Sequence, residues 1–564
     1  MSVFLLTNNL THINHFKNDS VTIERGFKFE LETQLGEYFL RIYRHVDDLR
    51  PYRISNAGEE IFFFGSVFYK KKFGAEAVKL FHDDLLNSTV DSSMLMGSFC
   101  ILYLDENKNC NIVNDSGAIY QLYSNEQGDF ITNSFLISSS IVQNKTINEM
   151  AFNANLLIGY IPYPDTLFSV IKRIQCEDKW GKFLLKQFDN IDNGKELKNY
   201  KDHVDYQTQL INAYINNLSD ALITHGVEMG ISGGYDSRLI LGMLLDKGIK
   251  ISAHTHYKKN DADPIIAQQL CDLVGIPLKL ISERPALKRQ EDFDAILNGS
   301  FLQFDGRVNS MMDFGKFEYT RDYRAKLFKA SNIMVSGVGG EMYRNHNFFN
   351  RNKISVDQFI VYYLINHRNW SIIHPKKKFD FLDYLKVGVE HSLDNKNYVS
   401  YKDNKRYYKS NWLRDWHGTR NTAENHFSAY VSPFADSFLS NAALRSVAHH
   451  GLLGKFEIDL IRSQNPKLTK LNSSYGFAFD DLPFFGGQKE LMKILAPIWI
   501  KMFLASKIKN IKTSNSITNR KFQEKKYIDI VKDSPLNFDL YQFIKNSGNI
   551  ELTYSLGYIL NKST

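Results

Sequence analysis

The first third of the chain alternates short apolar runs with turn residues. Residues 59–69 (EEIFFFGSVFY), 97–106, 109–125 and 129–138 are rich in β-branched and aromatic residues, and Gly, Asn and Asp separate them. Such runs predict short strands. Helical periodicity is scarce here, and residues 74–86 form one candidate helix. We therefore expect a strand-rich domain over residues 1–195.

The pattern changes after a polar stretch at residues 189–201, which is typical of a linker. Apolar residues then recur three and four apart over 205–226, which predicts a helix. The sequence continues with alternating predicted strands (227–231, 249–257, 276–282) and helices (236–248, 263–275). Strands that alternate with helices indicate a parallel sheet with crossover helices. Because residues 350–564 have a mostly helical pattern, we expect a second domain, 196–564, with an α/β fold and a helical C-terminal part.

Composition supports this division. With 564 residues, the chain is too long for one core and predicts at least two domains. A net charge of +7 is modest for this length and gives no reason to expect nucleic-acid binding. The four cysteines lack the CxxC spacing of a zinc site, and the apolar stretch 491–505 is interrupted by Lys and Pro. We expect a cytoplasmic protein without membrane insertion, and leave open whether it forms a homodimer.

The sequence SGGYDS, residues 232–237, stands between a predicted strand and a predicted helix. In an open parallel sheet, ligands bind beyond the carboxyl ends of the strands. Glycines let backbone N–H groups converge on an anion, the helix adds its positive N-terminal end, and Ser232 and Ser237 add hydroxyls. Asp236 would repel a bare anion, but it fits a phosphate bridged to the carboxylate by Mg²⁺. The loop therefore predicts a phosphate site that uses a metal ion.

Two other phosphate loops do not fit these residues. A Walker loop requires GxxxxGK[ST], and no lysine follows the glycines. A dinucleotide-binding loop requires GxGxxG, and that spacing is absent.

The loop resembles the SGGxDS pyrophosphate loop of adenine-nucleotide α-hydrolases and ATP pyrophosphatases, and within them the chain is similar to the asparagine synthetase family. VSGVGGEMYRNH, starting at Val335, resembles that family's SGxGxDExFxGY segment, and YVSPFADSFL, starting at Tyr430, resembles its PFLD segment. Residues 95–135, with the hairpin sequence DSGAIYQLY, are similar to the core of the family's glutaminase domain. The resemblance implies a glutaminase-like β-sandwich followed by an adenine-nucleotide α-hydrolase-like (HUP) domain.

It also implies ATP and Mg²⁺ as cofactors and a set of site residues. Asp236 and Glu341 would act as the catalytic residues and metal ligands. Contacts to ATP and pyrophosphate are expected from Ile231, Ser232, Gly233, Gly234, Asp236, Ser237, His256, Ser336 and Gly337. His256 also has a packing interpretation, as one of two histidines on a strand face. Arg307 would line the substrate pocket or form a structural salt bridge, and Tyr343 and Arg344 are weaker substrate candidates.

The departures from the family pattern matter for function. Family glutaminases use a cysteine at position 2, where this chain has Ser2, and Cys100 is predicted to lie within a core strand. Val338 replaces a glutamate that serves aspartate and ammonia in asparagine synthetases and a catalytic tyrosine in β-lactam synthetases. Met342 replaces the second residue of an acidic pair. We therefore expect a lost glutaminase activity and a substrate other than free aspartate.

These residues together predict an ATP-dependent amide-forming ligase. It would adenylate a small-molecule or peptide carboxylate, release pyrophosphate, and transfer the acyl group to ammonia or an amine. Natural-product, peptide or surface-polysaccharide biosynthesis would suit such a reaction. One alternative is a glutamine-hydrolysing asparagine synthetase, and another is a catalytically inactive scaffold that binds nucleotide.

Overall fold

The computed structural model describes residues 2–501, except 175–183, 187–196, 257–260, 282–289, 308–331, 366–372 and positions 18, 47, 49, 144, 246, 351 and 374. The N-terminal part contains two mainly antiparallel sheets, with strand orders β11-β9-β10-β1-β3-β2 and β12-β8-β7-β5-β4. Their strands are β1 (Ser2–Thr7), β2 (Phe27–Leu35), β3 (Tyr38–His45), β4 (Arg53–Asn56), β5 (Glu59–Tyr69), β6 (Lys72–Phe73), β7 (Leu95–Leu104), β8 (Cys110–Asn114), β9 (Leu122–Ser124), β10 (Phe130–Thr132), β11 (Lys172–Ile174) and β12 (Leu184–Lys186).

Apolar side chains from both sheets share one buried core. Phe4 of β1 and Phe64 of β5 stack with their ring centroids 4.5 Å apart, and Cys100 of β7 is buried beside them. Cys100 thus lies in a core strand, as predicted. The predicted strand-rich character of this region is confirmed, and its likeness to a glutaminase domain stays a prediction.

Several helices of the N-terminal part have no clear apolar period in the sequence. Only α3 (Ala75–Leu86) coincides with the predicted helix. The others are short and begin at capping side chains, such as Ser134, whose hydroxyl accepts from the Ile137 N–H. They are α1 (Leu10–Lys17), α2 (Ser20–Glu24), α4 (Phe135–Ile141) and α5 (Glu149–Ile158). Residues 135–138, predicted as the end of a strand run, are therefore helical.

The second part is built on a five-stranded parallel sheet of order β15-β14-β13-β16-β19. The strands are β13 (Val227–Gly230), β14 (Ile251–His256), β15 (Leu278–Ile281), β16 (Ile333–Val335) and β19 (Tyr430–Val431). The predicted order of strands and helices is confirmed. α8 ends at Gly275, in the left-handed conformation, as its sequence predicts. α7 ends four residues before Gly248, since the backbone at Leu245 is already extended. The helices along these strands are α6 (Tyr200–His225), α7 (Tyr235–Leu244), α8 (Ala262–Val274) and α9 (Gln290–Gln303).

The last described region is mostly helical, also as predicted, and two short strands that are far apart in the sequence, β17 (Ile354–Ser355) and β18 (Tyr398–Val399), pair antiparallel in it. A continuous helical segment runs through α13 (Tyr401–Tyr407), a π-helical stretch η7 (Tyr408–His417) and α14 (Gly418–Glu424). The other helices are α11 (Val356–Phe359), α12 (Lys378–Ser392), α15 (Ser437–Ala443), α16 (Lys455–Gln464) and α17 (Phe484–Leu495). Short 3-10 or π turns are η1 (Ser92–Met94), η3 (Gly340–Tyr343), η4 (Ile360–Leu364), η6 (Pro375–Lys377), η8 (Val447–His449) and η9 (Pro466–Thr469).

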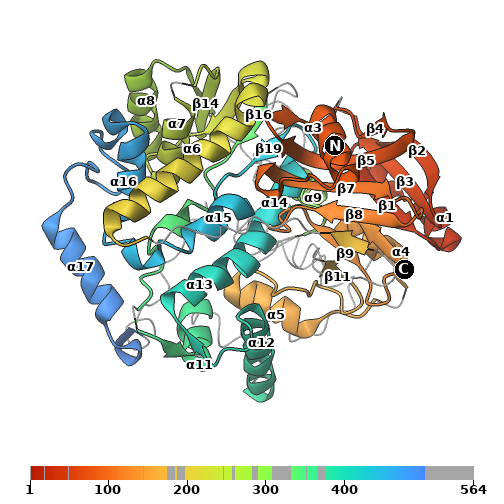
Figure 1. The fold of residues 1–564 in the computed structure, drawn as a ribbon. Coiled ribbons are helices and arrows are strands. Elements are labelled where there is room, and N and C mark those ends of the chain that lie inside the picture. Colours follow the sequence, from red (N-terminus) through yellow and green to blue (C-terminus); the bar gives the residue numbers. More distant parts are fainter. Residues whose placement is uncertain are drawn as a thin grey trace.

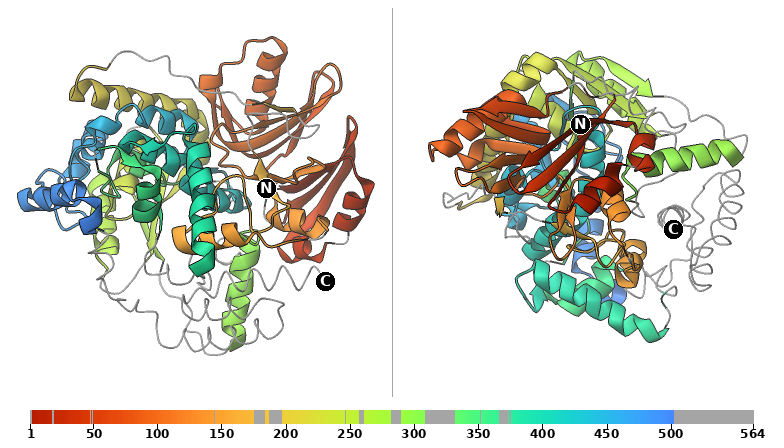
Figure 2. Two further views of the ribbon diagram at one scale, coloured as in Figure 1. Left: turned by 90° about the horizontal axis from the view of Figure 1, so that it is seen from below. Right: turned by 90° about the vertical axis from the view of Figure 1, so that its right-hand side faces the viewer.

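Figure 1 shows the antiparallel strands on one side of the molecule, the parallel sheet on the other, and α13, α14 and α15 near the centre. Figure 2 shows the same arrangement from below and from the side. The parts are joined by buried hydrogen bonds, such as the one from the Tyr430 N–H of β19 to the Ser66 hydroxyl of β5, 3.0 Å. The predicted linker at 189–201 and the boundary at 195/196 fall mostly outside the described residues. Within the described part of the chain, no helix has the length and apolarity needed to cross a membrane.

Candidate functional site

The candidate site lies where the order of the parallel sheet reverses. From β13 the chain moves outward through β14 to β15, and it then returns to place β16 on the other side of β13. Because β13 and β16 are neighbours, the loops that follow them start at adjacent strand ends and lie on the two sides of one crevice. Ligands of open α/β sheets bind at such a switch point.

The loop after β13 is held by its own polar groups. The Ser232 N–H donates to the Ser237 hydroxyl (3.1 Å), and the two serine hydroxyl oxygens are 3.1 Å apart. The Gly233 N–H donates to the Asp263 carboxylate at 2.9 Å, and the Gly234 N–H donates to the Ser232 hydroxyl at 3.3 Å. These amides are therefore occupied by oxygen acceptors of the chain itself, and a phosphate oxygen would have to replace those acceptors on binding. Ile231, which precedes them, is buried.

Asp236, in the first turn of α7, meets a cluster of charged groups that the two loops bring together. Arg344 donates to both of its carboxylate oxygens, from Nη1 and, at 3.2 Å, from Nη2. The same guanidinium pairs with Glu457 of α16, which is fully buried, and lies 3.6 Å from Glu341. One arginine therefore serves three carboxylates from three separate segments.

Burial and mutual repulsion tune these groups. Burial, and after it the charge of Asp236, raises the pKa of Glu341. Burial also raises the pKa of Glu457 well above its usual range, although Arg344 opposes this. For Arg344 itself, burial disfavours the charge, but Asp236 and Glu457 outweigh it and hold the pKa well above its ordinary value. Arg344 therefore stays charged at the centre of the cluster, while the environment favours the protonated form of Glu341 and of Glu457.

Two residues of the continuous 401–424 helical segment complete the cluster. The Lys405 ammonium group is buried and donates to the carbonyls of Glu341 (2.6 Å) and Arg344 (2.7 Å). Burial, together with the charge of Arg344, lowers the pKa of Lys405 to about 7. The Tyr408 hydroxyl donates to the Glu341 carboxylate at 3.2 Å. These residues fix the backbone and the side chain of the loop after β16.

Glycines let the two loops approach each other. A Cβ on Gly340 would lie 2.2 Å from an oxygen of Asp236, and one on Gly337 would lie 2.9 Å from the Asp236 carbonyl carbon. Both distances are too short for any larger residue without movement of the loop. The predicted site residue Gly337, and Gly340, which was not predicted, are therefore both required by the contact with Asp236.

Asp236 and Glu341 have the chemistry of a magnesium site. Mg²⁺ is usually held by one or two carboxylates together with substrate phosphates and water. Both side chains are about 25% exposed and converge on the same guanidinium. No cluster of three or more His, Cys, Asp or Glu suited to a metal occurs among the described residues. The pair fits Mg²⁺ delivered with a phosphate ligand rather than an all-protein cage, and such an ion would have to displace Arg344 from these carboxylates.

The remaining predicted residues are distributed as follows. The Ser336 hydroxyl accepts from the Val338 N–H (3.4 Å), so that it lies at the turn after β16. His256, at the end of β14, is exposed, with its ring 6.2 Å from that of His254. Tyr343 is fully buried against Phe434, so its contacts are those of a core residue.

Arg307 is buried in the salt bridge that the sequence offered as its alternative role. It pairs with Asp415, which also binds Arg173 at 2.6 Å. It further donates to Gln121 at 2.9 Å and to Tyr123 at 3.0 Å. These contacts join the N-terminal part to η7, and a substrate role for Arg307 stays a prediction.

Sequence reasoning missed several residues of the site. They are Tyr235, Arg238, Lys405, Tyr408 and Glu457. Arg238 is buried and donates to the carbonyls of Leu468 (2.9 Å) and Leu471 (3.0 Å). The Tyr235 ring stacks on Phe479 at 4.5 Å. The available signal was a charged residue within an otherwise apolar helix face, which marks Arg238 and Glu457 as groups that need a polar partner inside the protein.

Comparisons with known proteins add little to this geometry. No family model matches the chain, and no curated protein matches it. Among solved structures, it is similar to an NH3-dependent NAD synthetase from Campylobacter jejuni subsp. jejuni NCTC 11168 in complex with the nitrate ion, at 17% identity and a TM-score of 0.15. The match covers 26% of this chain and 58% of that one, so it spans less than two thirds of that enzyme. An overlap of this size supports no conclusion about the activity of this chain.

Proposed function

We propose that the protein is an ATP-dependent ligase that forms an amide through an acyl-adenylate. The observation that carries this proposal is that the SGGYDS loop, which contains Asp236, lies beside the segment with Glu341 at the switch point of the parallel sheet. Hydroxyls and a helix N-terminus are suited to pyrophosphate, and two carboxylates are suited to its magnesium ion. The pattern of donors favours cleavage between the α- and β-phosphates, because no lysine is placed as in a Walker loop.

The chain's residues would contribute by binding and orienting the reactants. An oxygen of the substrate carboxylate attacks the α-phosphorus, and the bond to pyrophosphate breaks. The amides of Gly233 and Gly234 and the hydroxyls of Ser232 and Ser237 would hold the departing oxyanion. An amine nitrogen then attacks the acyl carbon, loses a proton, and AMP leaves with the electron pair of the broken C–O bond. Mg²⁺ on Asp236 and Glu341 would supply further positive charge to the phosphates.

We propose ammonia or an amine, rather than glutamine, as the nitrogen source. Ser2 opens β1 in the middle of the first sheet and is 1% exposed. Its carbonyl accepts from the Asn133 side chain at 3.0 Å. A hydroxyl is also a weaker nucleophile than a thiolate near neutral pH. These features disfavour the alternative of a glutamine-hydrolysing asparagine synthetase.

The carboxylate substrate is a small molecule or a peptide other than free aspartate. Val338 follows Gly337 at the position where the resembled family places a glutamate, and it packs against Ala435 and Leu413. An apolar side chain offers no charge to recognise an α-amino group. Ring closure within one peptide and amidation of a sugar acid both satisfy this condition.

The test is ATP–pyrophosphate exchange against a panel of carboxylates that includes aspartate, uronic acids and peptides. We expect exchange with one class, and AMP with pyrophosphate as products in the presence of an amine. Formation of ADP and phosphate would contradict the proposal.

One observation favours a second candidate, a catalytically inactive nucleotide-binding scaffold. The Arg344 guanidinium pairs with Asp236 and lies 3.6 Å from Glu341, so its positive charge can balance these carboxylates without a metal ion. A site that has lost its metal would need such a balancing charge. The scaffold would bind ATP with an affinity that is independent of Mg²⁺ and would show no exchange with any carboxylate. Isothermal titration of ATP with and without Mg²⁺ separates the two candidates.

A further inference from the structure

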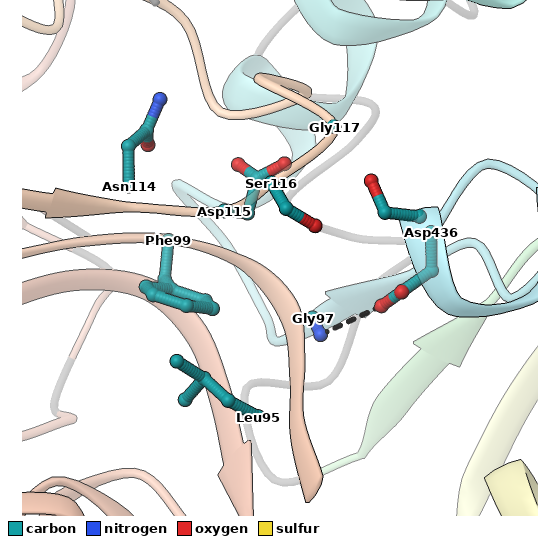
Figure 3. Close-up of a pocket in the computed structure, with 9 residues that line it drawn as sticks. Leu95, Gly97, Phe99, Asn114, Asp115, Ser116, Gly117 and Asp436 are labelled. Carbon is teal, nitrogen blue, oxygen red and sulfur yellow. Dashed lines mark hydrogen bonds between the residues drawn. The ribbon is translucent and has the colours of Figure 1, made fainter. Parts of the chain in front are cut away.

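A small cavity lies between the N-terminal part and the start of α15. Two segments singled out in the sequence meet there: the loop after β8 in the hairpin DSGAIYQLY, and the segment PFAD (Figure 3). Its polar walls include Gly97, Asn114, Asp115, Gly117, Asp436 and Ser437. Its volume of about 10 Å³ is room for one group of the size of water.

Two buried carboxyl groups reach this cavity from different elements. Asp115 accepts from the N–H groups of Ile119 (2.9 Å) and Tyr120 (2.8 Å). Asp436, the N-cap of α15, accepts from the N–H groups of Gly97 and Phe438, both at 2.9 Å, and from the Tyr214 hydroxyl at 3.2 Å. These donors favour the ionised form of each carboxyl and fix its position, while both oxygens of Asp115 and Oδ1 of Asp436 keep capacity for another interaction.

No positive group balances these two charges directly. Neither carboxylate forms an ion pair with a described residue, although Arg414 and Lys409 act on them from a distance. Burial raises the pKa of Asp115 to about 7 and that of Asp436 to about 6, which expresses the cost of two uncompensated charges. A buried charge usually requires a partner or takes up a proton, and no cationic side chain among the described residues pairs with either carboxylate.

Orphaned oxygen atoms on the same walls point to the same need. Ser437 is 3% exposed, and its hydroxyl has no hydrogen-bond partner; the side-chain oxygen of Asn114, which is 1% exposed, has none either. A Cβ on Gly117 would lie 3.3 Å from both the Ser437 hydroxyl and an Asp115 oxygen, so both atoms face the space that this glycine leaves open. The Ser437 hydroxyl and the Asp115 carboxylate therefore both face the cavity, and the hydroxyl has no hydrogen-bond partner there.

We propose that this cavity binds a monovalent cation of the size of water, K⁺ or NH₄⁺, between Asp115 and Asp436. The size suits both ions. The oxygen-only donor set of two carboxylates and the Ser437 hydroxyl is poor for Zn²⁺, which prefers nitrogen and sulfur. The ion would join the two parts of the molecule, and this role is independent of the proposed ligase activity.

The test is thermal unfolding of the full chain in choline chloride, with K⁺, NH₄⁺, Rb⁺ or Na⁺ exchanged in at constant ionic strength. We expect a saturable rise of the unfolding temperature with K⁺, Rb⁺ or NH₄⁺, because a ligand that binds only the folded state stabilises it. A rise with NH₄⁺ alone assigns the site to ammonium, and a rise with all three assigns it to any cation of that size. Equal unfolding temperatures in all salts would show that the cavity holds only water and would overturn the proposal.

Variants locate the effect. Asp436→Asn keeps an N-cap side chain for α15 but removes one charge, and it should weaken the cation dependence by at least about tenfold. Ser437→Ala should weaken it as well, and it serves if Asp436→Asn fails to fold. Ser440→Ala is the matched control, because its hydroxyl is equally buried and unpartnered on the same helix but does not line the cavity. A cation effect that survives unchanged in both test variants contradicts the assignment.

Discussion

The guanidinium of Arg344 donates to both carboxylate oxygens of Asp236, across the gap between the two loops that leave β13 and β16. The position of Asp236 is therefore set from two directions. Arg344 holds the Asp236 carboxylate by two hydrogen bonds. The absence of side chains at Gly337 and Gly340 lets the loop after β16 lie directly against Asp236. This contact orients the carboxylate that we propose as a ligand of Mg²⁺.

Asp236→Asn should remove most of the ATP–pyrophosphate exchange and leave the fold intact. The amide can still accept a hydrogen bond from Arg344 but has no charge for a metal ion. We expect a loss on the order of 10²–10³ in rate, typical of one missing electrostatic contact to the transition state. Asp205→Asn, at an exposed position of α6, is the control. Full exchange in a well-folded Asp236→Asn protein would refute the role of this residue.

Gly340→Ala should impair exchange although it changes no polar group. The new Cβ would lie 2.2 Å from Asp236, so the carboxylate or the loop has to move. A displacement of about 1 Å at a reacting group can cost roughly 10²-fold in rate. Gly487→Ala in α17 is the matched control, because its Cβ would have no neighbour closer than 3.9 Å. Similar exchange rates in the two variants would show that the approach of Gly340 to Asp236 has no catalytic consequence.

Lys405 should make stability depend on pH above neutrality. Burial, and then Arg344, lowers its pKa from 10.5 to about 7, so the unfolded chain binds a proton between these values and the folded chain does not. The free energy of unfolding therefore gains a term that rises with pH from about 7 upward. Lys405→Met keeps the length of the side chain and lacks this term. Unfolding midpoints in urea at pH 6 and pH 9 should show the wild type gaining on the variant at the higher pH, and parallel pH profiles would contradict the lowered pKa.

Ser2→Ala should leave the ligase reaction unchanged, and neither protein should release glutamate from glutamine. Ser2 is buried at the start of β1, and its hydroxyl is a poor nucleophile at neutral pH. Mass spectrometry should first establish whether Met1 is removed. ATP-coupled glutamate release that disappears in Ser2→Ala would identify Ser2 as a working nucleophile.

Local pattern was sufficient for much of the fold. Residues 59–69 were predicted as a strand from their composition, and β5 has these bounds. The alternation of apolar strands and periodic helices after residue 205 predicted the parallel sheet. The SGGYDS loop was placed between strand and helix because glycines interrupt two apolar runs. These features depend on neighbours in the sequence, which is why the sequence reveals them.

The short helices of the N-terminal part were missed for the converse reason. α1 and α2 contain few apolar residues at helical spacing, and capping and contacts with the sheet stabilise them instead. Arg307 shows the same limit at the level of one side chain. Its partner Asp415 is 108 residues away, and nothing near Arg307 in the sequence distinguishes a substrate contact from this buried ion pair.

The sequence by itself determined the order of strands and helices and the place of the SGGYDS loop between a strand and a helix, and the family resemblance implied that Asp236 acts together with Glu341. Only the tertiary structure decided what surrounds them. Glu457 and Lys405 come from helices more than sixty residues beyond that segment, and they meet Arg344 because the sheet and the helical part pack together. Asp115 and Asp436, the two carboxyls that line the cavity between the N-terminal part and α15, are likewise brought together only by packing. Electrostatic energy depends on distance and burial, and neither can be derived from separation along the chain.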